Sequence, residues 1–161
     1  MIDWLTVLRW THVIGATVLL GTGAGIAFFM VMAHRTRDPR IVAHVASTVV
    51  VADFLFTATA VVAQPVTGVL LARGVGWPLG ELWIVASLVL YAVTGAFWLP
   101  VVWMQIRMRD LAFAAADAGT PLPPAYHRLY RAWFVCGFPA FLAVLTIVWL
   151  MLAKPVWTRT L

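Results

Sequence analysis

Four long apolar runs alternate along the chain with polar connections. The runs cover residues about 4–34, 41–72, 81–108 and 129–153, and the connections are RTRDPR (35–40), GVGWPLG (74–80) and DLAFAAADAGTPLPPAYHR (110–128). A helix needs roughly 20 apolar residues to cross the hydrocarbon core of a bilayer. The pattern therefore predicts an all-α fold, a four-helix transmembrane bundle that forms a single domain over residues 1–161, with 110–128 as its one long loop.

Composition narrows the class of protein further. Of the 161 residues 63% are hydrophobic and 11% charged, whereas roughly a quarter of the residues in soluble domains are charged. Mean hydropathy is +0.96, which indicates an integral membrane protein embedded in a lipid bilayer. A net charge of +5 suggests nucleic acid as a partner of a soluble protein. Here the arginines lie between apolar runs, so we expect anionic headgroups as their partners and no nucleic acid.

The arginines also predict an orientation. They gather in the first connection and around the third, and Arg73 alone lies near the second. By the positive-inside rule the first and third connections face the cytoplasm, which places both termini outside, in the periplasm of a bacterium whose inner membrane holds the protein. Interfacial tryptophans are expected near the outer boundary: Trp4, Trp10, Trp77, Trp83, Trp149 and Trp157.

The opening MIDWLTVLRW lacks the basic start of a signal peptide, so we expect the first helix to be retained.

Polar side chains in the second run fall on one helical face, made of Asp53, Thr57, Ala60, Gln64 and Gly68, with Thr67 beside them. A charged side chain at the bilayer centre costs roughly 2.5 to 3.5 kcal/mol, so this face is expected to turn toward the protein interior. Pro65 removes a main-chain donor and is expected to leave a carbonyl near Val61 for another partner.

The first and third runs carry similar seams. In the first run the seam comprises Arg9, His12, Gly23, Met30 and His34; in the third it comprises Ser87, Tyr91, Gly95, Trp98, Gln105 and Arg109. The simplest bundle turns these seams toward the face of the second run. Gly21 and Gly25 form a small-xxx-small pair, which predicts close approach of two helices or clearance for a flat ligand.

His12 is the candidate of greatest interest, because a histidine about two turns into a spanning helix can bind haem iron or a metal, or relay protons. The alternative is a hydrogen bond to the helix that carries Gln64. Asp53 could accept a proton, pair with an arginine, fix the tautomer of a ligating histidine, or hold two helices together as a neutral acid.

The other histidines, His34, His44 and His127, are expected near the cytoplasmic surface. Solvated surface histidines are the simpler interpretation, and a three-His metal site is the alternative if the fold brings them together. No histidine matches His12 in depth, so a haem there would have one His ligand or a second ligand of another type. The single cysteine, Cys136, excludes an internal disulfide, and no C-x-x-C-H, phosphate loop or nucleophile elbow occurs.

RWTHVIGATVLLGTGAGIAFFMVMAHRTRD, AQPVTG, LW at the start of the third helix and FPAFLAVLTIVWLMLAKP resemble a family of small bacterial four-helix membrane proteins. That family is distantly similar to the CopD-like proteins and to HemJ, the protoporphyrinogen oxidase, whose first helix opens with Lys-x-x-His and ends with another histidine. Arg9 and His12 match the first pair, and His34 matches the last. The resemblance implies a haem or porphyrin role for His12. Arg9 replaces the family's lysine, and the basic residue that the family has early in the third helix is absent, with Glu81 nearby instead.

Three functional hypotheses follow. The first is a membrane oxidoreductase that binds haem b, in which His12 ligates iron, Arg9 pairs with a propionate, Gln64 and Asp53 supply supporting hydrogen bonds, and Tyr91 completes the cofactor site. The second is a conduit for protons, metal or a small solute through Asp53. The third is a structural subunit of a larger membrane complex or a homodimer, in which the polar seams serve assembly alone.

Overall fold

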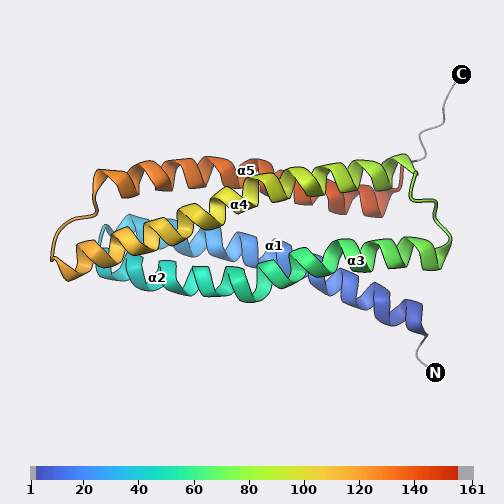
Figure 1. Ribbon diagram of the computed structural model, residues 1–161, viewed down its shortest axis with the longest axis horizontal. Coiled ribbons are helices and arrows are strands. Elements are labelled where there is room, and N and C mark those ends of the chain that lie inside the picture. The colour runs from blue at the N-terminus through green and yellow to red at the C-terminus, as the bar shows by residue number, and fades with distance from the viewer. Residues whose placement is uncertain (1–2, 156–161) are drawn as a thin grey trace, which may run out of the picture.

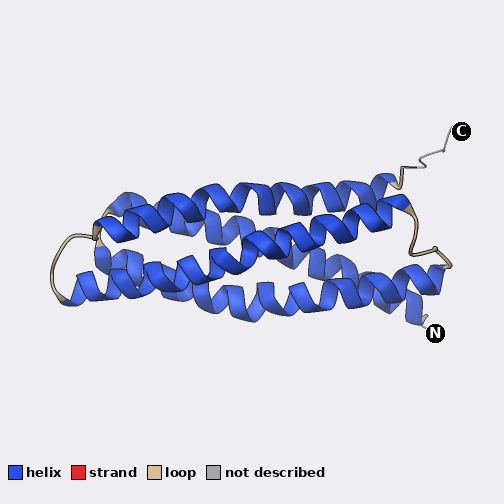
Figure 2. Cartoon of the chain, turned by 45° about the horizontal axis from the view of Figure 1, so that its top comes forward, coloured by secondary structure: helices blue, strands red, loops and turns tan. Residues whose placement is uncertain are grey.

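The computed structural model describes residues 3–155, and the chain folds into long helices (Figures 1 and 2). These are α1 (Trp4–Thr36), α2 (Pro39–Ala52), α3 (Ala58–Val75), α4 (Leu82–Asp117) and α5 (Pro124–Ala153). A π-helical turn, η1 (Asp53–Thr57), joins α2 to α3 without a break, so 39–75 is one continuous rod. No strand occurs in 3–155. Four helices in this part of the chain are long and apolar enough to span a membrane, which confirms the predicted all-α membrane bundle.

The helices run up and down, so α1 begins and α5 ends at the same end of the bundle (Figure 1). We call this the terminal end, and the opposite one the arginine-rich end. Large apolar side chains on the outer surface are exposed as lipid contact requires, among them Phe28, Phe29, Val62, Leu99 and Leu142. The tryptophans at positions 4, 10, 77, 83 and 149 lie in the parts of the chain nearest the terminal end, and Trp157 lies outside the described residues.

At the two short connections the helices begin and end as the sequence predicts. Asp38 caps α2 by accepting a hydrogen bond from the main-chain N of Arg40 (2.8 Å), and Pro39 occupies the first helical turn. Gly76 ends α3 with φ of 84°, a left-handed conformation that glycine adopts without strain. RTRDPR and GVGWPLG are therefore tight turns, and they fix neighbouring helices antiparallel.

The prediction of a long loop at 110–128 is wrong. Helix α4 continues to Asp117 and α5 begins at Pro124, which leaves 118–123 as the connection. Residues 111–117 are LAFAAAD, and alanine is the strongest helix former. Ala112 and Ala115 are buried as part of this helical extension. At 1.5 Å per residue α4 is about 54 Å long, well beyond the roughly 30 Å hydrocarbon core, so the bundle extends past the bilayer.

Packing differs between the two halves of the bundle. The arginine-rich half has a dense core in which alanines of α2 let the neighbouring helices approach; its members include Met30, Val42, Ala43, Ala46, Met104, Met108, Ala112 and Tyr126. Toward the terminal end α3 packs against α1, whereas α4 packs against α5. A cavity of about 920 Å³ lies between these two pairs. The bundle is thus solid in one half and hollow in the other.

Candidate functional site

The cavity collects the polar seams that the sequence indicated. All five predicted cofactor residues line it: Arg9, His12, Asp53, Gln64 and Tyr91. Its remaining walls are mainly apolar and come from every helix except α2, the rod contributing through η1 and α3. Cofactor and small-molecule sites are concave, mostly apolar and about 300–1,000 Å³ in volume. By size and lining, this cavity is the candidate site.

His12 is held by a side chain of α3. Its Nδ1 lies 2.8 Å from Oγ1 of Thr67, and the Thr67 hydroxyl donates to the main-chain oxygen of Ala63 (2.7 Å). A hydroxyl has one proton, so while Thr67 donates to Ala63 it can only accept from His12, and in this arrangement Nδ1 carries the imidazole proton. The Nε2 atom then keeps its lone pair. Within 3–155, Nε2 makes no hydrogen bond, and it is not one of the fully buried polar atoms that lack a partner.

Gln64 and two glycines bring α1 and α3 together around this histidine. Nε2 of Gln64 donates to the main-chain oxygen of His12 (2.8 Å). A Cβ on Gly15 would overlap the Gln64 amide, and one on Gly68 would lie 3.1 Å from Cε1 of His12. The close approach therefore occurs at Gly15 and Gly68.

The expected close approach at Gly21 and Gly25 is wrong. A Cβ at either position would meet nothing within 4 Å. The alternative of clearance for a ligand also misses these two positions, since the glycine of this segment that lines the cavity is Gly23. A sequence signal for the true contact existed, because Gly15 lies one turn after His12 and Gly68 one turn after Gln64.

Tyr91 crosses the cavity from α4. Its hydroxyl donates to the main-chain oxygen of Val61 in α3. Pro65 lies four residues after Val61 and has no N–H to complete the helical bond. The carbonyl that the sequence predicted to be free therefore receives its partner from α4.

The inner end of the cavity, which we call its floor, is built around Asp53. Nε1 of Trp98 donates to Oδ1 of Asp53 (3.3 Å). With the Gln105 amide oriented so that its nitrogen faces the carboxyl group, it donates to Oδ2 (2.8 Å) and its oxygen accepts from Nε1 of Trp133 (3.2 Å). Thr57, on the same π-helical turn, is buried, and its hydroxyl has no partner in the described chain.

These contacts correct two expectations for Asp53. No arginine or lysine of 3–155 pairs with it, since the ion pair found there joins Arg109 to Asp110. Nor does Asp53 fix the tautomer of His12, a role that Thr67 fills. Asp53 precedes Gln64 by 11 residues of one rod, which separates them by about 16 Å along the helix axis. Sequence reasoning missed Thr67 as the imidazole partner and Trp133 altogether.

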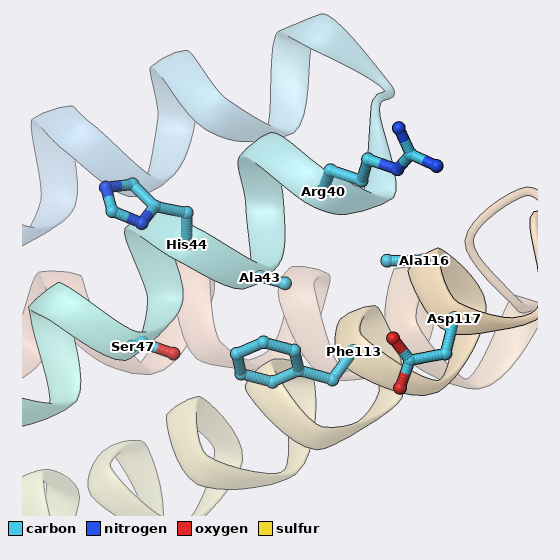
Figure 3. Close-up of a pocket in the computed structure, with 7 residues that line it drawn as sticks. All are labelled: Arg40, Ala43, His44, Ser47, Phe113, Ala116 and Asp117. Carbon is cyan, nitrogen blue, oxygen red and sulfur yellow. The ribbon is translucent and has the colours of Figure 1, made fainter.

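The remaining histidines lie at the arginine-rich end and do not form the three-His site considered above. His34 stacks on Tyr130, with ring centroids 3.6 Å apart, and lies edge-on to His127 at 5.6 Å. His44 instead lines a surface pocket of about 510 Å³ with Arg40 and Asp117 (Figure 3). Nowhere in the described chain do three His, Cys, Asp or Glu side chains group as metal ligands.

Comparison with known proteins gives a family. Neither the curated proteins nor the solved structures gave a match. A family model for predicted integral membrane proteins, DUF2269, matches residues 6–155, a range that includes the seams of α1, α3 and α4 and the whole cavity wall up to Lys154. The chain therefore belongs to the DUF2269 family of predicted integral membrane proteins.

Proposed function

We propose that this protein binds haem b in the cavity and takes part in electron transfer, with Nε2 of His12 as the iron ligand. The observation that carries the proposal is the contact between His12 and Thr67 (2.8 Å), which leaves Nε2 as the lone-pair nitrogen beside an apolar cavity. Ligating histidines almost always donate their other ring N–H to a fixed acceptor. The resemblance of RWTH to the Lys-x-x-His opening of the first HemJ helix, with Arg9 in place of the lysine, supports the choice of the same histidine.

The charges around the cavity suit an amphipathic porphyrin. Arg9 lines it about one helical turn before His12, and Lys154 lines it from the end of α5. Nζ of Lys154 lies 5.6 Å from the ring centroid of Trp77. Both cations are at the terminal end, where Arg9 would hold one propionate and Lys154 the other. The apolar walls would cover the macrocycle.

Haem would supply one-electron transfer at the iron. The residues of this chain would orient it: His12 through Nε2, Thr67 by fixing the imidazole, and Gln64 by tying α1 to α3 through the main-chain oxygen of His12. Tyr91 would keep α4 at the correct distance from α3. Asp53 lies too deep to contact the imidazole and would act at the floor.

A binding site is favoured over a conduit because the cavity ends inside the bundle. Beyond the floor, Met30, Met104 and Met108 are buried in the dense core of the arginine-rich half. A purely structural role is less favoured because the polar seams find their partners inside one chain, as the bonds of His12, Gln64 and Tyr91 demonstrate. Seams that serve assembly would instead be expected to face outward.

For orientation, we propose that the terminal end faces the periplasm of a bacterial inner membrane. Arg35, Arg37, Arg40, Arg107, Arg109, Arg128 and Arg131 all belong to the half that contains the connections at 37–38 and 118–123. Positive-inside orientation would place that half in the cytoplasm. The cavity would then be reached from the outer leaflet.

The test is the absorption spectrum of protein purified after expression with excess haem precursor. Wild type is expected to show a Soret band that His12→Ala loses. His44→Ala is the matched control, because His44 lies in the surface pocket away from the cavity, and it should keep the band. A wild type without a Soret band, even after titration with hemin, or a His12→Ala variant with an unchanged spectrum, would overturn the proposal.

A further inference from the structure

The floor of the cavity holds polar groups that haem binding through His12 does not use. Asp53 is 3% exposed and Thr57 is 7% exposed, and both line the cavity. They lie on η1, and π-helical turns inside longer helices occur frequently at functional sites. The floor is therefore a second polar centre, separated from His12 along the length of the cavity.

Asp53 has hydrogen-bond donors but no counter-ion. Trp98 and Gln105 donate to its two oxygens and so stabilise a negative charge. No Lys, Arg or His nitrogen of the described chain lies within salt-bridge distance of the carboxyl group. A buried charge without an opposite charge is strongly unfavourable, and at membrane depth such a residue marks a functional site by default. In its ionised form Asp53 therefore needs a cation.

Thr57 supplies further evidence for a ligand. Its hydroxyl is buried beside the Asp53 carboxyl group, and it makes no hydrogen bond of good geometry within 3–155. An unsatisfied buried polar atom is destabilising, so such atoms are uncommon unless something binds them. Thr57 lies one turn from Asp53 on the inward face of the rod, so one group can contact both.

Aromatic rings complete the chemistry of the floor. Trp98 and Trp133 lie at the floor, where their indole N–H groups bond to Asp53 and Gln105, and Phe134 and Phe138 also line the cavity. The faces of aromatic rings attract cations. An anion would be repelled by Asp53, and a neutral molecule would leave its charge uncompensated. A protonated amine satisfies all three features, since its N–H groups donate to the carboxylate and to the Thr57 oxygen while its charge lies among the rings.

We propose that Asp53 and Thr57 form a binding site for the ammonium group of a lipophilic organic amine, whose apolar body lies in the cavity. Access from the bilayer is expected between α3 and α4, which do not pack closely against each other. This route avoids Arg9 and Lys154, whose charges repel a cation at the terminal end. The site does not depend on haem.

The test uses purified protein in nanodiscs and a matched pair of probes, 2-(2-naphthyl)ethylamine and the neutral 2-ethylnaphthalene. Quenching of tryptophan fluorescence is expected to show saturable binding of the amine, at least about tenfold tighter than that of the neutral probe, because hydrogen bonds between charged groups are roughly twice as strong as neutral ones. Asp53→Asn should remove this preference, and Thr57→Val should reduce it. Asp110→Asn, at an exposed site, should leave it unchanged.

Two further measurements keep the outcome decisive. His12→Ala should lose any Soret band and still prefer the amine, so failure of haem binding and failure of amine binding are distinguishable. If Asp53→Asn does not fold, as judged by size-exclusion elution, the two probes on wild type still decide. Equal affinity of wild type for both probes, or an Asp53→Asn variant that keeps the preference, overturns the proposal.

Discussion

The hydroxyl of Tyr91 on α4 donates to the main-chain oxygen of Val61 on α3. These two helices otherwise belong to different pairs, α3 with α1 and α4 with α5. The bond depends on Pro65, which cannot donate to that oxygen from within α3. A proline in one helix and a tyrosine in another thus hold the cavity at a fixed width.

Tyr91→Phe is expected to destabilise the protein by about 1 kcal/mol, the usual size of a hydrogen bond between membrane helices. Thermal unfolding in detergent measures the loss. Tyr130→Phe is the control, because the Tyr130 hydroxyl makes no hydrogen bond within the described chain, and it should have little effect.

A double-mutant cycle sharpens this test. Pro65→Ala restores an N–H that can donate to Val61, so Tyr91→Phe should be less destabilising in that background. An equal loss in both backgrounds would show that the bond to Val61 carries none of the effect.

Gly15→Ala is expected to destabilise the protein by about 1–3 kcal/mol, the usual cost of overpacking, and to reduce haem content. Its methyl group would displace the Gln64 amide from the main-chain oxygen of His12. Gly21→Ala is the matched control in the same helix. Nothing lies near its Cβ, so the helix should gain roughly 0.5–1 kcal/mol from the alanine. Similar losses in both variants would contradict the close approach at Gly15.

Helical periodicity accounts for much of what the sequence could predict. It placed Asp53, Thr57 and Gln64 on one buried face, and all three are buried. His12, about two turns into its helix, was expected to reach the helix that carries Gln64, and hydrogen bonds link it to Gln64 and Thr67. Both inferences needed only the geometry of a single helix.

What the sequence could not supply are contacts that depend on how helices rotate and tilt against each other. The sequence places Gln105 in the seam of the third run, but only the packed bundle shows that its side chain reaches the Asp53 carboxyl group and links it to Trp133. The composition of 110–128 led to a wrong prediction, because its prolines suggested a loop over the whole segment. These prolines all follow the alanine-rich part, which is helical. Helix propensity outweighed the polar residues there.

Thr67→Val is expected to weaken haem binding about 10- to 100-fold, as loss of the partner of a ligating histidine commonly does. Valine keeps the shape of threonine but cannot accept from Nδ1 of His12. Titration of hemin into the apoprotein, followed at the Soret band, measures the affinity. Thr59→Val removes an exposed hydroxyl on the same helix and should leave the affinity unchanged. If the two variants behave alike, Thr67 does not position the ligand.

Haem bound in this cavity is expected to be high-spin with one open coordination position. His12 is the histidine that lines the cavity, and His34, His44 and His127 lie at the arginine-rich end. The reduced protein should therefore bind carbon monoxide, with a shift of the Soret band. His34→Ala should leave this spectrum unchanged. A low-spin spectrum in wild type that becomes high-spin in His34→Ala would place the haem elsewhere.

The proposed orientation predicts which connections are accessible from outside the cell. In a Cys136→Ser background, Gly80→Cys places an exposed thiol in the turn at the terminal end, and Thr120→Cys places one between α4 and α5. A membrane-impermeant maleimide should label Gly80→Cys in intact cells, whereas Thr120→Cys should react only after the membrane is permeabilised. The arginines on the Thr120 side are the physical reason, because they are retained on the cytoplasmic face. The opposite labelling pattern would invert the protein and turn the cavity toward the cytoplasm.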